Sequence, residues 1–171
     1  MVYTWTKKLH KRLFPPRCRL CRAPGEASLE LCAACRAELP WLTHRCARCA
    51  LPLRRESGIS LCNHCINAPP PLDACDALFD YRGPVDGWIR DLKFAQDLAA
   101  ARLLGGLLAG RIAEDRRGPP ATLVPVPLHR KRLAQRGYNQ ALEIARMLCE
   151  QGYRLDAACC RRQRTTSPQS D

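Results

Sequence analysis

Four cysteine pairs with identical internal spacing constrain this chain more than any other feature. They make two units, C-x2-C-x10-C-x2-C and C-x2-C-x12-C-x2-C. Each C-x2-C pair places two sulfurs on one tight turn, and two pairs complete a tetrahedral shell around one cation. The segment from 18 to 65 carries too few bulky apolar residues to build its own core. We therefore predict two metal sites with ligands in chain order: Cys18, Cys21, Cys32 and Cys35, then Cys46, Cys49, Cys62 and Cys65.

Zinc is the metal that a shell of four thiolates favours, and iron is the alternative. A disulfide framework is disfavoured because the N-terminus lacks the apolar segment of a signal peptide. Thioredoxin-like redox pairs are disfavoured by the fourfold repetition. Two structural zinc ions would supply roughly 10–16 kcal/mol each. His64 is expected to be an exposed neighbour rather than a ligand, and the remaining cysteines are interpreted as ordinary thiols: Cys75, Cys149, Cys159 and Cys160.

The charge balance favours an anionic partner. The 28 Lys and Arg against 16 Asp and Glu give a formal charge of +12, which two four-thiolate zinc sites would lower to about +8. Such a balance is typical of proteins that bind nucleic acid, phosphate or pyrophosphate, although a basic protein without such a partner is the alternative. The predicted zinc-binding segment could contact nucleic acid, dock a protein or serve only as structure. The loops of this segment carry many arginines: Arg19, Arg22, Arg36, Arg45, Arg48, Arg54 and Arg55.

The pattern of apolar residues, prolines and glycines divides the chain into four parts. We predict a basic amphipathic helix over 1–14, the double zinc ribbon over 15–68, a proline-rich linker over 69–73 and an α/β domain over 74–171. No apolar stretch is long enough to span a bilayer. Strand, helix and loop patterns in the last part predict a parallel sheet. They predict strands over 74–81 and 123–126, helices over 84–94, 98–114 and 140–150, and a loop over 128–136.

The basic loop is a candidate anion site. It follows a short apolar strand and precedes Gly137 and a helix that Asn139 can cap. Backbone amides at a helix N-terminus favour anions, and ligands of open α/β sheets bind beyond the carboxyl ends of strands. A solvated basic turn is the alternative. The predicted phosphate or pyrophosphate ligands are His129, Arg130, Arg132, Arg136, Gly137, Asn139 and Gln140.

The combined motifs resemble the ComF (competence protein F) family, including the related GntX proteins. The resemblance rests on the four cysteine pairs, on Tyr81 and on the runs 13–18 (LFPPRC), 92–94 (LKF), 124–129 (VPVPLH) and 136–141 (RGYNQA). The stretch R-x-R-x-T-x-x-Q of that family is matched by Arg162, Arg164, Thr166 and Gln169. In that family a double zinc ribbon precedes a type I phosphoribosyltransferase domain. The resemblance implies a cytoplasmic protein linked to uptake or use of external DNA, with DNA or DNA-uptake and recombination proteins as partners. It also implies phosphoribosyl pyrophosphate as ligand, with Mg²⁺ in a complete domain and the basic loop on the pyrophosphate side.

One family motif is missing from these residues. Type I phosphoribosyltransferases hold the ribose and its 5-phosphate with an acidic pair followed by Thr-Thr-Gly, whereas the Thr-Thr pair of this sequence, Thr165-Thr166, lies in a polar segment. We therefore expect an incomplete, truncated phosphoribosyltransferase-like α/β domain, without transfer activity of its own and with no catalytic residue to assign. The alternative is a zinc-ribbon module that binds nucleic acid or protein without catalysis, or a non-functional fragment.

Overall fold

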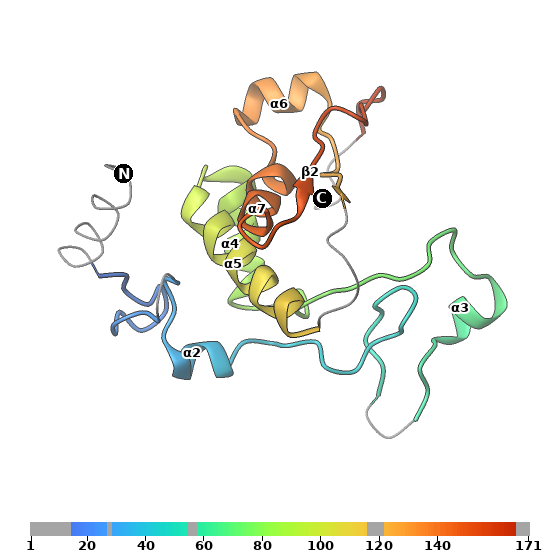
Figure 1. Cartoon of the computed structure of the whole chain (residues 1–171), viewed down its shortest axis with the longest axis horizontal. Coiled ribbons are helices and arrows are strands. Elements are labelled where there is room, and N and C mark those ends of the chain that lie inside the picture. The colour runs from blue at the N-terminus through green and yellow to red at the C-terminus, as the bar shows by residue number, and fades with distance from the viewer. Residues whose placement is uncertain (1–14, 27–28, 55–57, 116–121, 167–171) are drawn as a thin grey trace. The chain divides into compact units, whose positions relative to one another are not determined.

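The computed structural model describes residues 15–26, 29–54, 58–115 and 122–166, so the helix predicted over 1–14 lies outside the described residues. Helices dominate, and the strands are short (Figure 1). No helix within the described ranges is both long enough and apolar enough to cross a membrane. The elements in chain order are α2 (Ala33–Ala37), α3 (Asn63–Asn67), α4 (Val85–Phe94), α5 (Leu98–Asp115), β1 (Thr122–Leu123), α6 (Arg130–Arg136), α7 (Gln140–Cys149) and β2 (Arg154–Leu155).

The chain divides into two compact units. Unit 1 combines residues 1–37 with 88–171, and unit 2 comprises residues 38–87. The two cysteine sets therefore lie in different units: the first in unit 1 and the second in unit 2. We call the segments that carry them the first ribbon (residues 15–37) and the second ribbon (residues 41–67).

Helices α5 and α7 form the centre of unit 1. They approach closely at Gly105, where a Cβ would lie 2.7 Å from the carbonyl oxygen of Ile144 and 2.7 Å from Cγ of Met147. A side chain there would force the two helices apart, so glycine permits this packing. The predicted helices over 84–94, 98–114 and 140–150 are confirmed to within about two residues at each end. The buried apolar side chains of these helices include Trp88, Leu92, Leu103, Leu104, Leu107 and Leu148.

The first ribbon packs against another face of α5. Leu31 is completely buried, and a Cβ at Gly106 would lie 2.7 Å from Cδ2 of Leu29. Because consecutive residues of an α-helix point about 100° apart, Gly105 and Gly106 serve two different neighbours of α5. This explains why α5 is apolar around much of its circumference instead of along one stripe.

Two ion pairs border the contact between the first ribbon and α5. Both terminal nitrogens of the Arg19 guanidinium donate to the carboxylate of Asp97, just before α5 begins. A terminal nitrogen of Arg102 lies 3.6 Å from Oε1 of Glu30. The Arg19 and Asp97 side chains are only about one-fifth exposed (21% and 22%), so the pair is held with little room for solvent.

Unit 2 has a small apolar core built around the second cysteine set. Leu53 and Leu61 pack against the buried cysteines of this set. In the same unit the Trp41 and Phe79 rings lie 4.6 Å apart between centroids, inclined at 44°. The prediction of a sheet strand over 74–81 is wrong. Phe79 makes only an isolated antiparallel bridge with Trp41, because its segment pairs with the second ribbon instead of a neighbouring strand.

The sheet of unit 1 is much smaller than predicted. β1 and β2 pair in parallel over two residues each, with Thr122 opposite Arg154 and Leu123 opposite Leu155. The predicted buried strand over 123–126 is wrong beyond Leu123, since Val124 and Val126 are 47% and 67% exposed. Proline has no N–H to continue a ladder, so Pro125 limits the strand. Within the described residues the unit is mostly helical, and the larger parallel sheet is not formed.

Candidate metal centres and an arginine-lined hollow

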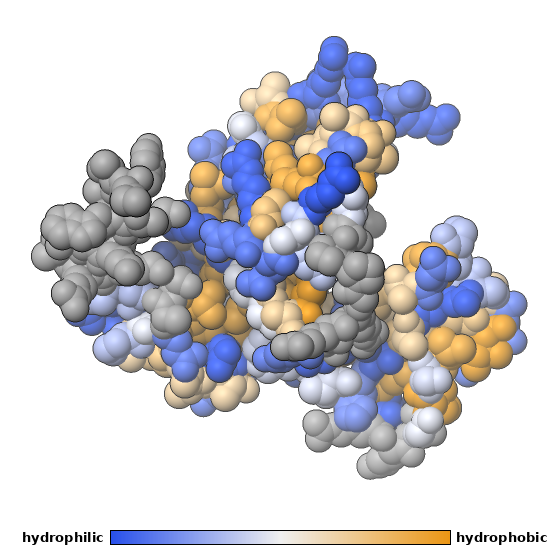
Figure 2. Space-filling model, in the orientation of Figure 1, coloured by the Kyte–Doolittle hydropathy of each residue, from blue (hydrophilic) through white to orange (hydrophobic). Residues whose placement is uncertain are grey.

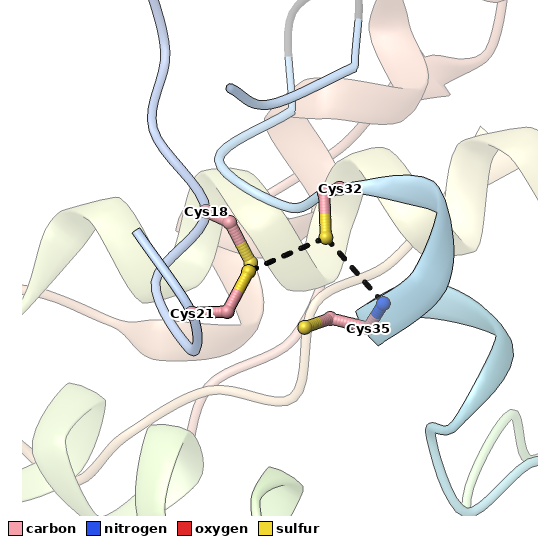
Figure 3. Close-up of side chains that lie close together, drawn as sticks. All are labelled: Cys18, Cys21, Cys32 and Cys35. Atoms are coloured by element: carbon pink, nitrogen blue, oxygen red, sulfur yellow. Dashed lines mark hydrogen bonds between the residues drawn. The ribbon is translucent and has the colours of Figure 1, made fainter. Parts of the chain in front are cut away.

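The first predicted cysteine set comes together in unit 1. Cys18 and Cys21 lie on one tight turn, while Cys32 and Cys35 lie at the start of α2 (Figure 3). The four sulfurs all lie within 4.8 Å of one another. Sγ of Cys21 is 3.5 Å from Sγ of Cys32, and the backbone N–H of Cys35 donates to Sγ of Cys32 at 3.5 Å. Four sulfur donors therefore converge on one point.

The second set repeats this arrangement in unit 2. Its four sulfurs also lie within 4.8 Å of one another. The N–H of Cys65 donates to Sγ of Cys62 at 3.5 Å, as Cys35 does to Cys32 in the first set. The first turn of each set ends on a left-handed residue, with φ of 65° at Arg22 and 59° at Ala50. The repeat visible in the sequence is therefore also a repeat of backbone hydrogen bonding.

Both sets fit a tetrahedral cation. With Zn–S bonds of about 2.3 Å, sulfurs at the corners of a tetrahedron lie about 3.8 Å apart. The Cys21–Cys32 and Cys49–Cys62 sulfur separations are 3.5 and 3.7 Å. Both are far longer than the roughly 2.05 Å of a disulfide bond, and all eight cysteines carry free thiols. The two four-cysteine sites are thus consistent with two structural zinc ions. His64 is exposed and lies outside both sets.

The electrostatics of the two sites explain why a cation is needed. Burial alone would raise the pKa of Cys18, but backbone N–H donors, led by that of Cys21, lower it to about 6. Cys46 behaves alike: burial opposes ionisation, and backbone donors led by Cys62 lower its pKa to about 6. Hydrogen bonds with Cys21 and Cys32 raise the pKa of Cys35 well above its usual range. A divalent cation is what allows four adjacent thiols to become thiolates together.

Several arginines of the ribbons hold the fold together instead of facing a partner. Arg19 pairs with Asp97, and Nε of Arg36 lies 3.3 Å from Oε2 of Glu26. Arg45 pairs with Asp76 and also donates to the carbonyl oxygen of Leu42 at 2.9 Å. Their charge is therefore partly neutralised within the chain. Among the ribbon arginines, Arg55 lies outside the described residues.

The predicted basic loop over 128–136 is instead a helix, α6. The Nδ1 atom of His129 caps its N-terminus by accepting the N–H of Lys131 at 3.3 Å. Gly137 ends it with φ of 83° and donates to the carbonyl oxygen of Leu133 at 2.8 Å. The residues between are good helix formers. They carry no apolar stripe, in line with the exposure of most of α6. Helix propensity together with Gly137 as a stop signal could have revealed it.

A hollow of about 570 Å³ lies between the start of α7, α6 and the segment after β2. Asn139 caps α7 by accepting the N–H of Ala141 at 3.0 Å, and its amide nitrogen donates to the carbonyl oxygen of Val126 at 3.0 Å. Arg130, Gly137 and Asn139 are the predicted phosphate ligands that line the hollow. Its guanidinium groups outnumber its single carboxylate, that of Glu143. An anion is therefore the ligand that its charge favours.

The other predicted phosphate ligands are not in the lining of the hollow. His129 caps α6, with its ring nitrogens 3.4 Å from the Thr165 hydroxyl. Arg132 donates to the carbonyl oxygen of Thr166 at 3.3 Å. The guanidinium of Arg136 lies 5.5 Å above the Phe94 ring. Gln140 has its amide nitrogen buried without a hydrogen-bond partner among the described residues.

Three arginines absent from the predicted set line the hollow instead: Arg146, Arg161 and Arg162. Arg146 lies on α7 and is held 3.1 Å from the Glu143 carboxylate. Arg161 and Arg162 follow the turn after β2. Figure 2 shows hydrophilic residues gathered over α6 and this last segment. The sequence signal for them was a cluster of arginines late in the chain, but only the fold brings that cluster to the start of α7.

Comparison with known proteins shows what this chain is similar to. A family model of the double zinc ribbon domain matches residues 9–66. The DNA utilization protein YhgH of Salmonella typhimurium is 31% identical over 132 residues, which cover 74% of this chain. Competence protein F of Haemophilus influenzae is 28% identical over 137 residues, or 77% of this chain. The chain is a homologue of competence protein F.

The predicted resemblance to the ComF family is thereby confirmed. A YhgH protein of Escherichia coli (strain CFT073) aligns over 91% of this chain at 29% identity. The chain spans 57% of the length of the Salmonella typhimurium protein and 58% of that of competence protein F. No solved structure matches the chain.

Proposed function

We propose that this protein is a DNA-utilisation protein that carries two structural zinc ions and binds a phosphate-bearing ligand in the hollow beside α7. The observation that carries the ligand-binding part of this proposal is the set of arginines that line the hollow: Arg130, Arg146, Arg161 and Arg162. Guanidinium groups bind phosphate oxygens by paired hydrogen bonds. The N-terminal end of α7 adds a favourable partial positive charge.

Phosphoribosyl pyrophosphate is the ligand that the family relationship suggests. Its pyrophosphate would contact Arg130 and the N-terminal end of α7. The sequence lacks the acidic pair with Thr-Thr-Gly that would hold the ribose, so the proposal for these residues is binding and not transfer. Because zinc-binding thiolates persist in a reducing compartment, we propose that the protein acts in the cytoplasm.

Calorimetric titration with inorganic pyrophosphate, and with phosphoribosyl pyrophosphate plus Mg²⁺, tests the binding proposal. We expect saturable binding to the zinc-loaded chain that weakens at least tenfold in Arg130→Gln combined with Arg161→Gln, since each lost charged contact contributes about 1–3 kcal/mol. Arg111→Gln is the matched control, because Arg111 lies on α5 and pairs with Glu114. Binding that is absent at low salt, or that is equally weakened in the control, would overturn the proposal.

The zinc proposal has a separate test. Metal analysis of the purified chain should give two zinc ions, and Cys75→Ser should leave that number unchanged because Cys75 lies outside both sites. Fewer than one bound zinc per chain would overturn the assignment of both sites.

A zinc-ribbon module that binds nucleic acid without catalysis is the second candidate. The formal charge of +12 favours it. Binding of this kind falls steeply with salt. Arg22→Gln with Arg48→Gln should weaken binding to a DNA oligonucleotide and flatten its salt dependence. Arg45→Gln should instead destabilise unit 2, because Arg45 holds Asp76 and the Leu42 carbonyl.

A further inference from the structure

Four cysteines remain outside the two metal sites, and the structure separates one pair of them from the rest. Cys75 is exposed in unit 2, and Cys149 at the end of α7 donates to the carbonyl oxygen of Ala145 at 3.8 Å. Cys159 and Cys160 are adjacent, both exposed, with their sulfurs 3.9 Å apart. Two adjacent thiols can close a disulfide that an isolated thiol cannot form; because their Cα atoms lie only about 3.8 Å apart, this disulfide is strained and is readily reduced again.

A hydrogen-bonded turn holds this pair in place. The N–H of Asp156 donates to the carbonyl oxygen of Leu123 at 2.9 Å, which ties the turn to β1. The Asp156 carboxylate accepts the N–H groups of Ala158 and Cys159 at 2.9 and 3.0 Å. The turn is thereby fixed at both its beginning and its middle, and it presents the two sulfurs at the surface.

The two sulfurs have different surroundings. Cys160 lines the hollow together with arginines from α6, α7 and its own segment, whereas Cys159 is not part of that lining. The thiol of Cys159 donates toward the sulfur of Cys160. Burial, followed by this hydrogen bond, raises the pKa of Cys159, so Cys159 keeps its proton more readily. Because Cys160 lines the hollow and Cys159 does not, Cys160 is the sulfur that a reagent entering the hollow meets first.

The charge of the hollow selects the reagent. Guanidinium groups of Arg130, Arg146 and Arg161 line it with Cys160, so an anionic molecule is attracted to this sulfur and a cationic one is repelled. A small disulfide that carries carboxylates, such as glutathione disulfide, combines this charge with the right chemistry. Cys75 is exposed and is not in the lining of the hollow, so it serves as the internal reference.

We propose that Cys160 and Cys159 form a thiol–disulfide exchange site for anionic low-molecular-weight disulfides. The Cys160 thiolate attacks one sulfur of glutathione disulfide, the reagent's S–S bond breaks, and the released thiolate takes up the proton that Cys160 lost. Cys159 then attacks the Cys160 sulfur of the mixed disulfide, and a second glutathione leaves with the proton of Cys159. The protein dithiol is oxidised to one disulfide, and one glutathione disulfide is reduced to two glutathione molecules.

The test uses the full zinc-loaded chain and glutathione disulfide, with alkylation at timed intervals and peptide mass spectrometry. We expect Cys160 to react about tenfold or more faster than Cys75, because favourable charge raises association rates by at least that factor. Cys159→Ser should accumulate glutathione on Cys160, since no second thiol resolves it. Cys160→Ser should lose the fast reaction, while Cys149→Ser should retain it.

Cystamine, a cationic disulfide, separates the role of charge from that of simple exposure. It should react with Cys160 no faster than with Cys75, and high salt should remove the preference for glutathione disulfide. Equal rates at Cys160 and Cys75 with glutathione disulfide, or a fast reaction that survives in Cys160→Ser, would overturn the proposal. Both results are read from sulfur chemistry alone, so they do not depend on whether the hollow binds pyrophosphate.

Discussion

The two ribbons share one backbone plan but differ in what surrounds them. In both, the backbone N–H of the first cysteine donates to the carbonyl oxygen of the residue five positions later: Cys18 to Ala23 and Cys46 to Leu51. The first ribbon has Leu31 fully buried within unit 1. The second ribbon lies in unit 2, where Ile59 and Ile66 remain 52% and 58% exposed. Figure 2 shows hydrophobic residues at the surface around α3, in line with these values.

The difference shows that a metal site and an apolar core can contribute to folding in different proportions. The first ribbon has both a four-sulfur site and the packing of Leu29 and Leu31 within unit 1. The second ribbon depends more on its site, because none of its described apolar side chains other than its cysteines is as completely buried as Leu31; Leu42 and Ala50 are 8% and 7% exposed, and Leu53 and Leu61 are only partly buried. We therefore expect the two ribbons to respond differently to the same kind of damage.

Loss of one cysteine from each site should give the largest effect and the clearest contrast. Cys62→Ser should release one zinc and expose all of unit 2 to hydrogen exchange, since metal binding supplies about 10–16 kcal/mol. Cys32→Ser should also release one zinc, but amides near Leu31 should keep part of their protection. Metal analysis with hydrogen-exchange mass spectrometry measures both. Equal loss of protection in the two ribbons would contradict the comparison.

Truncation of equivalent leucines should come next in size. Leu31→Ala removes a side chain with no exposure, and large-to-small changes at such positions destabilise by about 2–5 kcal/mol. Leu61 holds the corresponding place before the third cysteine of its set but is only partly buried. Leu61→Ala should therefore lower the free energy of unfolding by less than half as much. Hydrogen exchange within each unit separates the two effects, and a larger loss at Leu61 would reverse our ranking.

The ion pair of the first ribbon should make it more sensitive to acid than the second. The hydrogen bond from Arg19 is the main cause that holds the pKa of Asp97 below its usual 3.8, against the opposing effect of burial. Its stabilisation is therefore present above about pH 4 and is lost as pH falls through the lower, folded-state pKa. Asp97→Asn should destabilise unit 1 by about 1–3 kcal/mol at neutral pH and remove this pH dependence.

Asp76→Asn is the matched control in the second ribbon. Asp76 pairs with Arg45 but its side chain is 48% exposed, so the change should lower the stability of unit 2 by less than about 1 kcal/mol. Denaturant unfolding followed by hydrogen exchange at several pH values measures both variants. An Asp97→Asn variant as stable as the parent would show that Arg19 is not needed for the packing of the first ribbon.

A glycine pair on α5 should give the smallest effect. Gly110→Ala meets no atom within 4 Å, so better helix propensity should stabilise unit 1 by about 0.5–1 kcal/mol. At Gly106 the new Cβ would lie 2.7 Å from Cδ2 of Leu29. Leu29 must then move, which should cancel the gain. Thermal unfolding of the two variants compares them, and an equal gain at both positions would mean that Leu29 does not restrict this face of α5.

Much of the candidate metal chemistry could be predicted from the sequence, and much less of the anion site. Two short spacings, ten and twelve residues, bring each second pair of cysteines back to the first, so the ligand sets follow from local geometry. The anion site depends on segments distant in sequence. Arg161 reaches the hollow only because β2 pairs with β1, and β2 is a two-residue strand that begins with an arginine. Such a strand carries no alternating pattern to detect.

The sequence by itself determined the cysteine grouping, helices α4, α5 and α7, and the cap of α7 by Asn139, because each depends on residues a few positions apart. Only the tertiary structure showed that the first ribbon packs against α5, where Leu29 meets Gly106. It also placed three unpredicted arginines and Cys160 around one hollow. Long-range contacts of this kind rest on the complementary shapes of distant segments, which local pattern does not encode.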